Sequence, residues 1–223
     1  MRKEAAHRRT TTRHLVWDWN GTLMDDLDLC LEIINDFLGK RGRPPVDRAS
    51  YLDQFDFPVR RYYERLGLAD TDLSFEEASH EFIHGYEARR TTCGLHAEVR
   101  TTLEAASSAG LRQSLLSAYK HDTLEGIVDH FGLRGHFDAL SGHADIYAEG
   151  KAARAAALVA ASGHAPDETL FIGDTFHDYE VARHVGAPCV LLSHGHHSAA
   201  RLASAGVPVL PSMAALRAHL GLR

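Results

Sequence analysis

Carboxylate side chains end two apolar runs of this chain, each of which has the length of a buried strand. Asp18 ends the run that begins at Leu15, and Asp174 ends the run that begins at Thr169. Open parallel sheets place their chemistry at the carboxyl ends of the strands, so we expect these two carboxylates to lie at one edge of a sheet. A carboxylate there can act as a nucleophile or as a ligand of a hard cation.

Three further residues are expected at the same edge. Ser117 ends the apolar run from Leu111, Lys151 follows the next predicted strand, and Asp178 lies one helical turn after Asp174. Oxygen ligands suit Mg²⁺, and the serine and the lysine would hold a phosphate that the ion bridges. Each residue alone also fits an ordinary strand end, a solvated helix start or a partner of a helix dipole. Their common order along the chain favours one shared site.

The elements that position these residues follow from the apolar periodicity. After about residue 95 short apolar runs alternate with amphipathic helices, which predicts right-handed crossovers and a parallel sheet covered on both faces. Before residue 95 the apolar periodicity is helical, and no segment has a convincing strand pattern. We therefore predict an α/β fold, a Rossmann-like doubly wound parallel sheet with an all-α insertion after the first strand. The expected parts are a flexible tail over 1–13, a core over 14–23 and 96–223, and the insertion over 24–95.

Local signals predict where helices begin and end. Ser74 and Glu77 have the form of a capping box, and Asp122 and Ser212 are expected to cap two later helices. Gly186 is expected to stop the helix that follows Asp174. The stretch 40–48 is basic and contains two prolines, so we expect a linker there.

Composition narrows the classes of function. The chain has 223 residues, 44% hydrophobic content and a formal net charge of -6, so it can bury a good core but has no general electrostatic basis for binding nucleic acid or acidic membranes. Its three widely spaced cysteines are typical of free thiols in a reducing compartment. No apolar run approaches the roughly 18 residues of a membrane span, and Met1–Arg13 lacks the apolar region of a signal peptide. We expect a cytoplasmic protein, either a monomer or a homodimer.

With these motifs the sequence resembles the haloacid dehalogenase superfamily of phosphotransferases and hydrolases, from about Leu15 to Leu220. The DxDxT motif of that family is matched at Asp18-Trp19-Asn20-Gly21-Thr22 except at one position, and its GDxxxD motif at Gly173-Asp174-Thr175-Phe176-His177-Asp178. These two motifs are specific. The family's serine and lysine fall on Ser117 and Lys151, which are recognisable only by their order. The insertion resembles the helical cap of the phosphoglycolate phosphatase and β-phosphoglucomutase branch.

The resemblance implies a magnesium-dependent phosphatase that acts on a small phosphorylated metabolite through an aspartyl phosphate. The cap would close over the leaving group and choose the substrate. Stabilising the charge of the phosphoryl group is most of what such a transfer asks of a protein. The implied roles are nucleophile for Asp18, Mg²⁺ binding for the Asp18 side chain, the Asn20 backbone carbonyl and Asp174, an indirect metal role for Asp178, and phosphate binding for Thr22, Ser117 and Lys151.

Asn20 departs from the family pattern. Family phosphatases have an aspartate there that protonates the leaving oxygen and later activates water, and an amide can do neither. General acid–base help is worth about 10²–10⁴ in rate. Three explanations are open: a substrate with a good leaving group, such as an acyl phosphate or a pyrophosphate; a substitute group, with His177, Asp25 and His121 nearest in sequence; or a slow or catalytically impaired relative that binds and regulates.

Other members of the family are less favoured. A phosphonate hydrolase is expected to carry a Schiff-base lysine in the cap, where the insertion offers only Lys40. A phosphomutase is expected to need the aspartate that Asn20 replaces. Both therefore remain as alternatives to the phosphatase.

Two groups of basic side chains remain. Ser193-His194-Gly195-His196-His197 follows a predicted strand, but zinc needs three or four ligands fixed in space. We interpret this run as a loop at the mouth of the site, in which His196 could touch substrate. In the insertion, an arginine such as Arg60 could reach a carboxylate or a second phosphate, although solvated helix faces explain such residues more often. The arginines concerned are Arg60, Arg61, Arg89 and Arg90.

Overall fold

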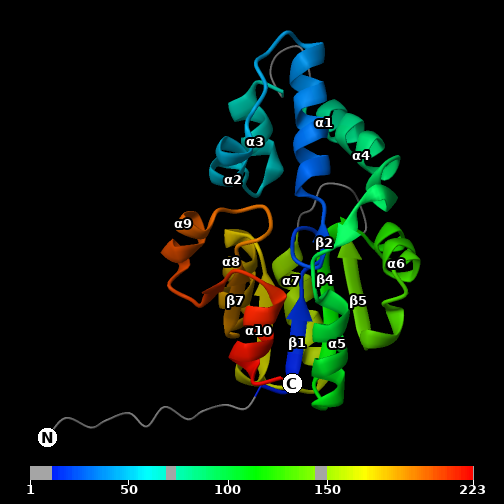
Figure 1. Cartoon of the computed structure of the whole chain (residues 1–223), viewed down its shortest axis with the longest axis vertical. Helices are drawn as coiled ribbons and strands as arrows, with labels where there is room; N and C mark the ends of the chain where they lie inside the picture. The colour runs from blue at the N-terminus through cyan, green and yellow to red at the C-terminus, as the bar shows by residue number, and fades with distance from the viewer. Residues whose placement is uncertain (1–11, 69–73, 144–149, 223) are drawn as a thin grey trace, which may run out of the picture.

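A computed structural model of the chain describes residues 12–68, 74–143 and 150–222. The predicted tail over 1–13 lies outside the described residues except for its last two. In Figure 1 a layer of helices, α1 to α4, lies above a sheet that is flanked by further helices.

Six strands form the main sheet, in the order β5-β4-β1-β6-β7-β8, and every neighbouring pair is parallel. The first strand lies between β4 and β6, so the carboxyl ends of three strands that carry predicted site residues are adjacent. The predicted α/β fold class is confirmed. The strands are β1 (His14–Trp17), β4 (Arg112–Lys120), β5 (Ala139–His143), β6 (Thr169–Gly173), β7 (Cys189–Leu192) and β8 (Val209–Leu210).

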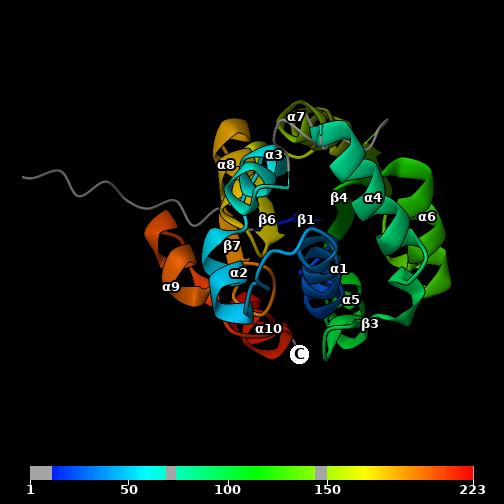
Figure 2. The ribbon, with the colours of Figure 1, turned by 90° about the horizontal axis from the view of Figure 1, so that it is seen from above.

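Helices cover both faces of the sheet because side chains alternate along each strand. In β1, Leu15 and Trp17 join one buried apolar cluster, whereas Val16 joins the other. The first cluster includes residues of α5 (Val99–Ser108), α6 (His121–His130) and α10 (Met213–Leu220). The second includes residues of α7 (Lys151–Ser162), α8 (Phe176–Val185) and α9 (Ala199–Leu202). Figure 2 shows these two sets of helices from above.

The segment after the first strand is mainly helical. It contains α1 (Leu27–Lys40), α2 (Arg48–Gln54), α3 (Val59–Leu66) and α4 (Phe75–Glu87), which we call the cap helices. Short 3₁₀ helices connect other elements, at Arg90–Thr92, Arg134–His136, Pro166–Glu168 and Ala203–Ala205. The boundary that separates a cap over 24–95 from a core stays a prediction.

One prediction about this segment was wrong, and one of its helices was not predicted. Met24–Asp25 (β2) and Gly94–Leu95 (β3) form a two-stranded antiparallel sheet where no strand was expected. Strands of two residues are too short to show an alternating pattern. Helix α2 was also missed; it begins at the end of the predicted linker, where Asp47 accepts a hydrogen bond from the backbone N–H of Ser50.

The predicted helix and strand ends had mixed outcomes. The capping box of Ser74 and Glu77 and the Ser212 cap are confirmed, and Gly186 ends α8 in the left-handed conformation. However, β4 does not end at Ser117 but continues to Lys120, with an irregular register in between. Helix α6 consequently begins at His121, one residue before the predicted cap Asp122.

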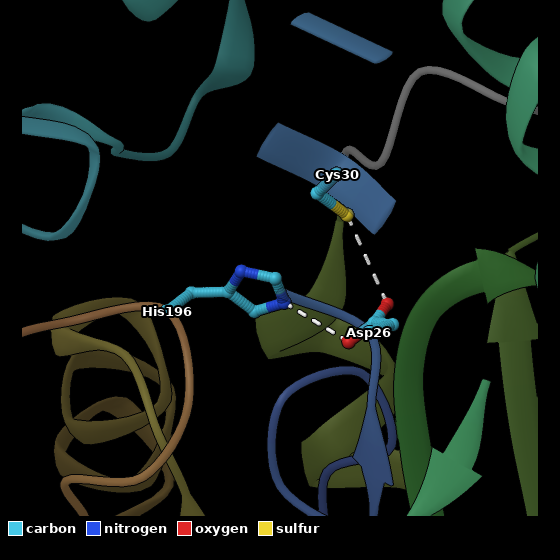
Figure 3. A group of neighbouring side chains, drawn as sticks. All are labelled: Asp26, Cys30 and His196. Carbon is cyan, nitrogen blue, oxygen red and sulfur yellow. Dashed lines mark hydrogen bonds and ion pairs between the residues drawn. The ribbon is translucent and has the colours of Figure 1, made fainter. Parts of the chain in front are cut away.

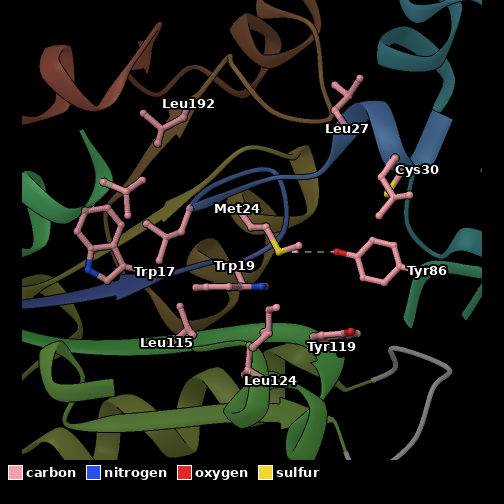
Figure 4. Packing of buried hydrophobic residues seen from close by; sticks show 14 of the residues in the cluster. Trp17, Trp19, Met24, Leu27, Cys30, Tyr86, Leu115, Tyr119, Leu124 and Leu192 are labelled. Atoms are coloured by element: carbon pink, nitrogen blue, oxygen red, sulfur yellow. Dashed lines mark hydrogen bonds between the residues drawn. The ribbon is translucent and has the colours of Figure 1, made fainter. Parts of the chain in front are cut away.

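One apolar cluster joins the sheet to the cap helices. Figure 4 shows Trp17 and Leu115 of the sheet, Trp19 and Met24 after the first strand, and Tyr86 of α4 in a continuous row. Burial of these large side chains stabilises the packing of the cap helices above the site. Among the described helices, none has the length and apolar character required to cross a bilayer.

Candidate active site

Asp18 lies directly after β1, at the carboxyl end of the sheet. Its backbone N–H donates to the carbonyl of Ile172 in β6 at 2.8 Å, and only 8% of the residue is exposed. Gly21 then turns the chain with φ of 71°, and a Cβ at this position would lie 2.3 Å from Oδ2 of Asp174. A glycine is therefore required where the loop after β1 meets the end of β6.

Lys151 is the cation of the site. It begins α7 and is buried, and its ammonium group donates to Oδ1 of Asp18 at 2.5 Å and to Oδ1 of Asp178 at 2.6 Å. Burial opposes its charge, but the two carboxylates outweigh burial and raise the pKa of Lys151 above its usual range. The lysine therefore stays protonated and fixes the nucleophile predicted at Asp18.

Asp174 and Asp178 complete a group of carboxylates. Asp174 accepts hydrogen bonds from the hydroxyl of Thr22 at 2.6 Å and from the backbone N–H of His196 at 2.7 Å. Asp178 lies in the first turn of α8, where its Oδ2 accepts from both the backbone N–H and the hydroxyl of Thr175. Oxygen atoms of Asp18, Asp174 and Asp178 lie within 4.8 Å of one another, and we call these three residues the carboxylate cluster.

The carboxylate cluster holds more negative charge than Lys151 offsets. Burial, helped by the other two carboxylates, raises the pKa of Asp18 to about 8, despite Lys151. Burial and Asp178 raise the pKa of Asp174 to about 6, although His196 opposes them. Burial also acts on Asp178, but Lys151 outweighs it and lowers that pKa. A further cation at the cluster would stabilise the charged form of Asp18.

The donor set fits Mg²⁺, which prefers carboxylate oxygens and keeps several waters. Both oxygens of Asp178 already accept hydrogen bonds, Oδ1 from Lys151 and Oδ2 from Thr175. Asp178 is thereby suited to orient Lys151, whereas Asp18 and Asp174 are the better candidates for direct ligands. Mn²⁺ would suit the same donors.

Ser117 and Asn20 lie beside Asp18. The hydroxyl of Ser117 accepts from the backbone N–H of Tyr119 at 3.0 Å and is 3.5 Å from Oδ1 of Asn20. Both residues line the same cavity as Asp18 and Lys151. The structure thus brings together four of the residues that the sequence assigned to one site.

The comparisons with known proteins agree with this geometry. The sequence model described as haloacid dehalogenase-like hydrolase matches residues 15–192. The chain belongs to this family.

Its relatives in the haloacid dehalogenase-like family include phosphoglycolate phosphatases. One from Synechococcus elongatus is 25% identical over 86% of this chain and 88% of its own length. Another, from Aquifex aeolicus, is 28% identical over 82% of this chain and 86% of its own length. The crystal structure of a predicted phosphatase from Clostridium acetobutylicum has a TM-score of 0.79, with 19% identity over 94% of this chain and 98% of that one. The last likeness concerns the fold alone.

Asn20, the departure from the family motif, is held by a buried carboxylate. Its amide nitrogen donates to Oδ2 of Asp26 at 2.8 Å and to the hydroxyl of Tyr86 at 2.7 Å. The hydroxyl of Tyr86 donates in turn to the same oxygen of Asp26 at 2.6 Å. An aspartate at position 20 would instead place two carboxylates in contact, so the amide suits its surroundings.

Asp26 also forms an ion pair with His196, as Figure 3 shows. Oδ1 of Asp26 lies 3.2 Å from Nε2 of His196, and it accepts from the backbone N–H of Gly21 at 2.8 Å. Burial alone would lower the pKa of His196, but Asp26 outweighs burial and raises it to about 9. Asp26 has a lowered pKa in return, again against the effect of burial. The pair is therefore a salt bridge at neutral pH.

Cys30 of α1 completes a second group whose atoms lie within 4.8 Å of one another. Its thiol is 3.9 Å from Oδ2 of Asp26, and Nδ1 of His196 is hydrogen-bonded to the hydroxyl of Tyr51 at 3.1 Å. Burial raises the pKa of the Cys30 thiol well above its usual range. Because the atoms of this group are engaged with one another, we interpret it as a hydrogen-bonded support for the loop after β1.

The histidine run after β7 proves to be packed against this loop. His196 lines the cavity, as expected, whereas His194 stacks on His96 with ring centroids 3.8 Å apart and bonds to the carbonyl of Thr22 at 3.1 Å. His197 accepts a hydrogen bond from the backbone N–H of Phe176 at 2.9 Å. The three histidines thus point to different neighbours.

Two predicted site residues have other partners. Thr22 is fully buried, donates to Asp174 and is not among the residues that line the cavity, so here it orients a carboxylate. Arg60 is exposed, and its guanidinium lies 4.2 Å from the centre of the Phe75 ring, outside the cavity. The substrate contact of Arg60 stays a prediction, because in this structure Arg60 contacts Phe75 and does not line the cavity.

The groups nearest in sequence to a missing acid do not line the cavity either. His177 stacks on Phe57 at 5.0 Å, and Asp25 is exposed in β2. His121 accepts from the backbone N–H of Gly142. The titratable groups that bond to the side chain of Asn20 are Asp26 and Tyr86 instead. Sequence spacing gave no sign of Asp26, because Asp26 resembles an ordinary helix start.

Proposed function

We propose that this chain is a magnesium-dependent phosphatase that acts on a small phosphorylated metabolite through an aspartyl phosphate. The observation that carries the proposal is the carboxylate of Asp18, held 2.5 Å from Lys151 within the carboxylate cluster and open to a cavity under the cap helices. The phosphoglycolate phosphatases among its relatives support the same class of reaction.

In the first step an oxygen of Asp18 attacks phosphorus, and the bond between phosphorus and the leaving oxygen breaks. Lys151 offsets the negative charge of the phosphoryl group, and the hydroxyl of Ser117 can donate to one of its oxygens. In the second step water attacks phosphorus, the bond to Asp18 breaks with its electron pair on the carboxylate oxygen, and the proton of the attacking water leaves with the released phosphate or to solvent.

A divalent cation held by Asp18, Asp174 and the backbone carbonyl of Asn20 would draw charge away from the phosphoryl oxygens. Asn20 does not protonate the leaving oxygen, since an amide has no acidic proton to give. The electron pair therefore leaves on that oxygen, which takes its proton from water. Substrates with acidic leaving groups are favoured as a result.

The decisive experiment measures phosphate release from acetyl phosphate with and without Mg²⁺. We expect turnover by the natural chain and a loss of at least about 10⁴-fold in Asp18→Asn, because the nucleophile is removed. Asp25→Asn is the matched control, since Asp25 is an exposed carboxylate that does not line the cavity. Mg²⁺ binding without phosphate release by the natural chain would contradict the proposal and favour a binding or regulatory role.

A second experiment asks whether the family aspartate can be restored. Asn20→Asp alone is expected to be unstable, since it faces Asp26 across 2.8 Å. The double change Asn20→Asp with Asp26→Asn exchanges the two side chains, so an amide donor still faces a carboxylate acceptor. We expect the double variant to be the more stable of the two in thermal unfolding; equal stability would show that Asp26 does not oppose an aspartate at position 20.

A further inference from the structure

The cavity above Asp18 changes character along its length. It has a volume of about 160 Å³. Near Asp18 it is lined by charged groups, but the cap helices and the residue that follows α2 contribute aromatic and aliphatic side chains. These include Phe55, Tyr62, Tyr63, Phe75, Phe82 and Ile83, which we call the aromatic end.

No cation from the cap helices lines the cavity within the described part of the chain. The segments 69–73 and 144–149 contain no Lys, Arg or His in the sequence. The two cations that do line it are already paired, Lys151 with Asp18 and Asp178, and His196 with Asp26. The guanidinium of Arg60 lies 4.2 Å from the centre of the Phe75 ring but does not line the cavity. A leaving group with a carboxylate would therefore enter an apolar space without a counter-charge from a lining residue, which is unfavourable.

The apolar lining of the aromatic end suits a hydrocarbon ring, and the whole cavity, charged end included, has a volume of about 160 Å³. An apolar cavity of about 150 Å³ in another protein binds benzene, which sets the scale.

The chemistry at Asn20 points to the same class of leaving group. A phenol has a pKa of about 10, like the tyrosine side chain, so a departing phenolate needs little help from an acid. An aliphatic alcohol is a much weaker acid and needs the proton that Asn20 lacks. Cavity shape and catalytic chemistry are separate observations, yet both favour an aromatic alcohol.

We propose that the aromatic end binds an aryl leaving group and that the chain prefers aryl phosphates to phosphates that carry a carboxylate. This inference rests on the proposed phosphatase activity. Asp18 forms a bond to phosphorus, the bond from phosphorus to the aryl oxygen breaks with its electron pair on oxygen, and the phenolate takes a proton from water. Hydrolysis of the aspartyl phosphate then follows as for any substrate.

The test compares phenyl phosphate with 4-carboxyphenyl phosphate, which have similar leaving groups but differ by one charge at the far end of the ring. We expect kcat/KM to be at least about tenfold lower for the carboxylate, because that charge would be buried without a partner. In Ile83→Lys, which adds a cation to the aromatic end, this ratio is expected to shrink. His80→Lys is the matched control, since His80 is exposed on the same helix, and it should leave the ratio unchanged.

Equal kcat/KM for the two aryl esters would overturn the inference. So would cyclohexyl phosphate reacting as fast as phenyl phosphate, because the rings are similar in size and only one leaves as a phenolate. If acetyl phosphate is hydrolysed in an Asp18-dependent manner while these outcomes occur, the phosphatase stands and only the aryl preference fails.

A binding measurement separates the cavity from turnover. Phenylphosphonate and 4-carboxyphenylphosphonate cannot be hydrolysed, and calorimetric titration in the presence of Mg²⁺ gives their affinities for the natural chain. Tighter binding of phenylphosphonate supports an apolar subsite even if no phosphate is released. Equal or weaker binding contradicts it.

Discussion

The two ends of the cavity are built on opposite principles. Near Asp18, charged groups are buried in contact, and each depends on a partner: Lys151 on two carboxylates, and His196 on Asp26. At the aromatic end, rings pack on one another, as in the stack of Phe82 on Tyr86 with centroids 6.0 Å apart. A buried ion network loses several kcal/mol when one member is removed, whereas an apolar wall tolerates changes that keep its volume.

The two ends of the cavity therefore have different roles. The charged end sets the reaction, because its groups act on the phosphoryl oxygens wherever the rest of the substrate lies. The aromatic end sets the choice of leaving group, because only that part of the substrate reaches it. Changes at the charged end should therefore alter stability and turnover together, and changes at the aromatic end should alter mainly selectivity.

Lys151→Met should produce the largest effect on stability. It leaves Asp18 and Asp178 buried without their shared cation, and breaking a buried pair in this way costs about 3–5 kcal/mol. Chemical unfolding at pH 7 measures the loss. Adding Asp178→Asn to Lys151→Met removes one of the stranded charges and should recover part of it. A loss below about 1 kcal/mol, the worth of an exposed pair, would show that the charged end is not a dependent network.

Binding of Mg²⁺ should have the second-largest effect on stability. If the carboxylate cluster binds the ion, the folded state gains about 2.7 kcal/mol at a concentration of 100 Kd. The thermal midpoint should rise with Mg²⁺ in the natural chain and not in Asp174→Asn, which lacks one proposed ligand but keeps the size of the side chain. An equal rise in both proteins would place the ion elsewhere.

His14 gives a comparison outside the cavity. It is fully buried in β1, bonded to the hydroxyls of Ser114 and Thr169, and burial, followed by nearby His164, lowers its pKa to about 4. The unfolded chain then binds the extra proton below pH 6.5, so stability is complete above that pH and falls as the pH drops toward 4. The loss at pH 5 is about 2 kcal/mol.

The His14→Gln variant isolates this contribution. Other buried histidines, such as His194 and His197, also have lowered pKa values and act in the same direction. The difference between the natural chain and His14→Gln should therefore be compared at pH 7 and at pH 5. The variant should lose about 2 kcal/mol less stability over this interval; an equal loss would mean that His14 does not contribute to the acid sensitivity.

The contrast between the two ends also explains what the sequence could predict. Asp18, Asp174 and Lys151 follow predicted strands or begin a predicted helix, so parallel pairing alone brings them together. The α/β fold was predictable for the same reason, because periodicity survives in strands and helices of ordinary length.

The rest depends on packing between segments that are distant in the sequence. Asp26 looks like a helix start until Tyr86, sixty residues later, donates to it. Thr22 belongs to the motif that begins at Asp18. Its hydrogen bond to Asp174 forms only because two loops approach each other. The aromatic end is assembled from several helices, and no spacing in the chain encodes a cavity. These features follow from tertiary contacts that local patterns do not contain.

Tyr86→Phe should give the smallest effect, and it examines the place where the two ends meet. The ring of Tyr86 lines the cavity, whereas its hydroxyl donates to Asp26 and accepts from Asn20. Removing the hydroxyl should cost only about 1 kcal/mol, because Asp26 keeps donors from Asn20, Gly21 and His196. The aromatic wall is retained, so the preference for phenyl phosphate over 4-carboxyphenyl phosphate should not change.

Turnover provides the second measurement on Tyr86→Phe. Asn20 loses one of its two amide partners, so kcat should fall modestly while KM for an aryl ester stays the same, since KM reports the intact ring. If KM rose while kcat stayed the same, the hydroxyl of Tyr86 would take part in substrate binding. The boundary between the charged end and the aromatic end would then lie closer to Asp18. A change in neither would leave the hydroxyl with a purely structural part in holding Asp26, because the network around that carboxylate would then be sufficient without it.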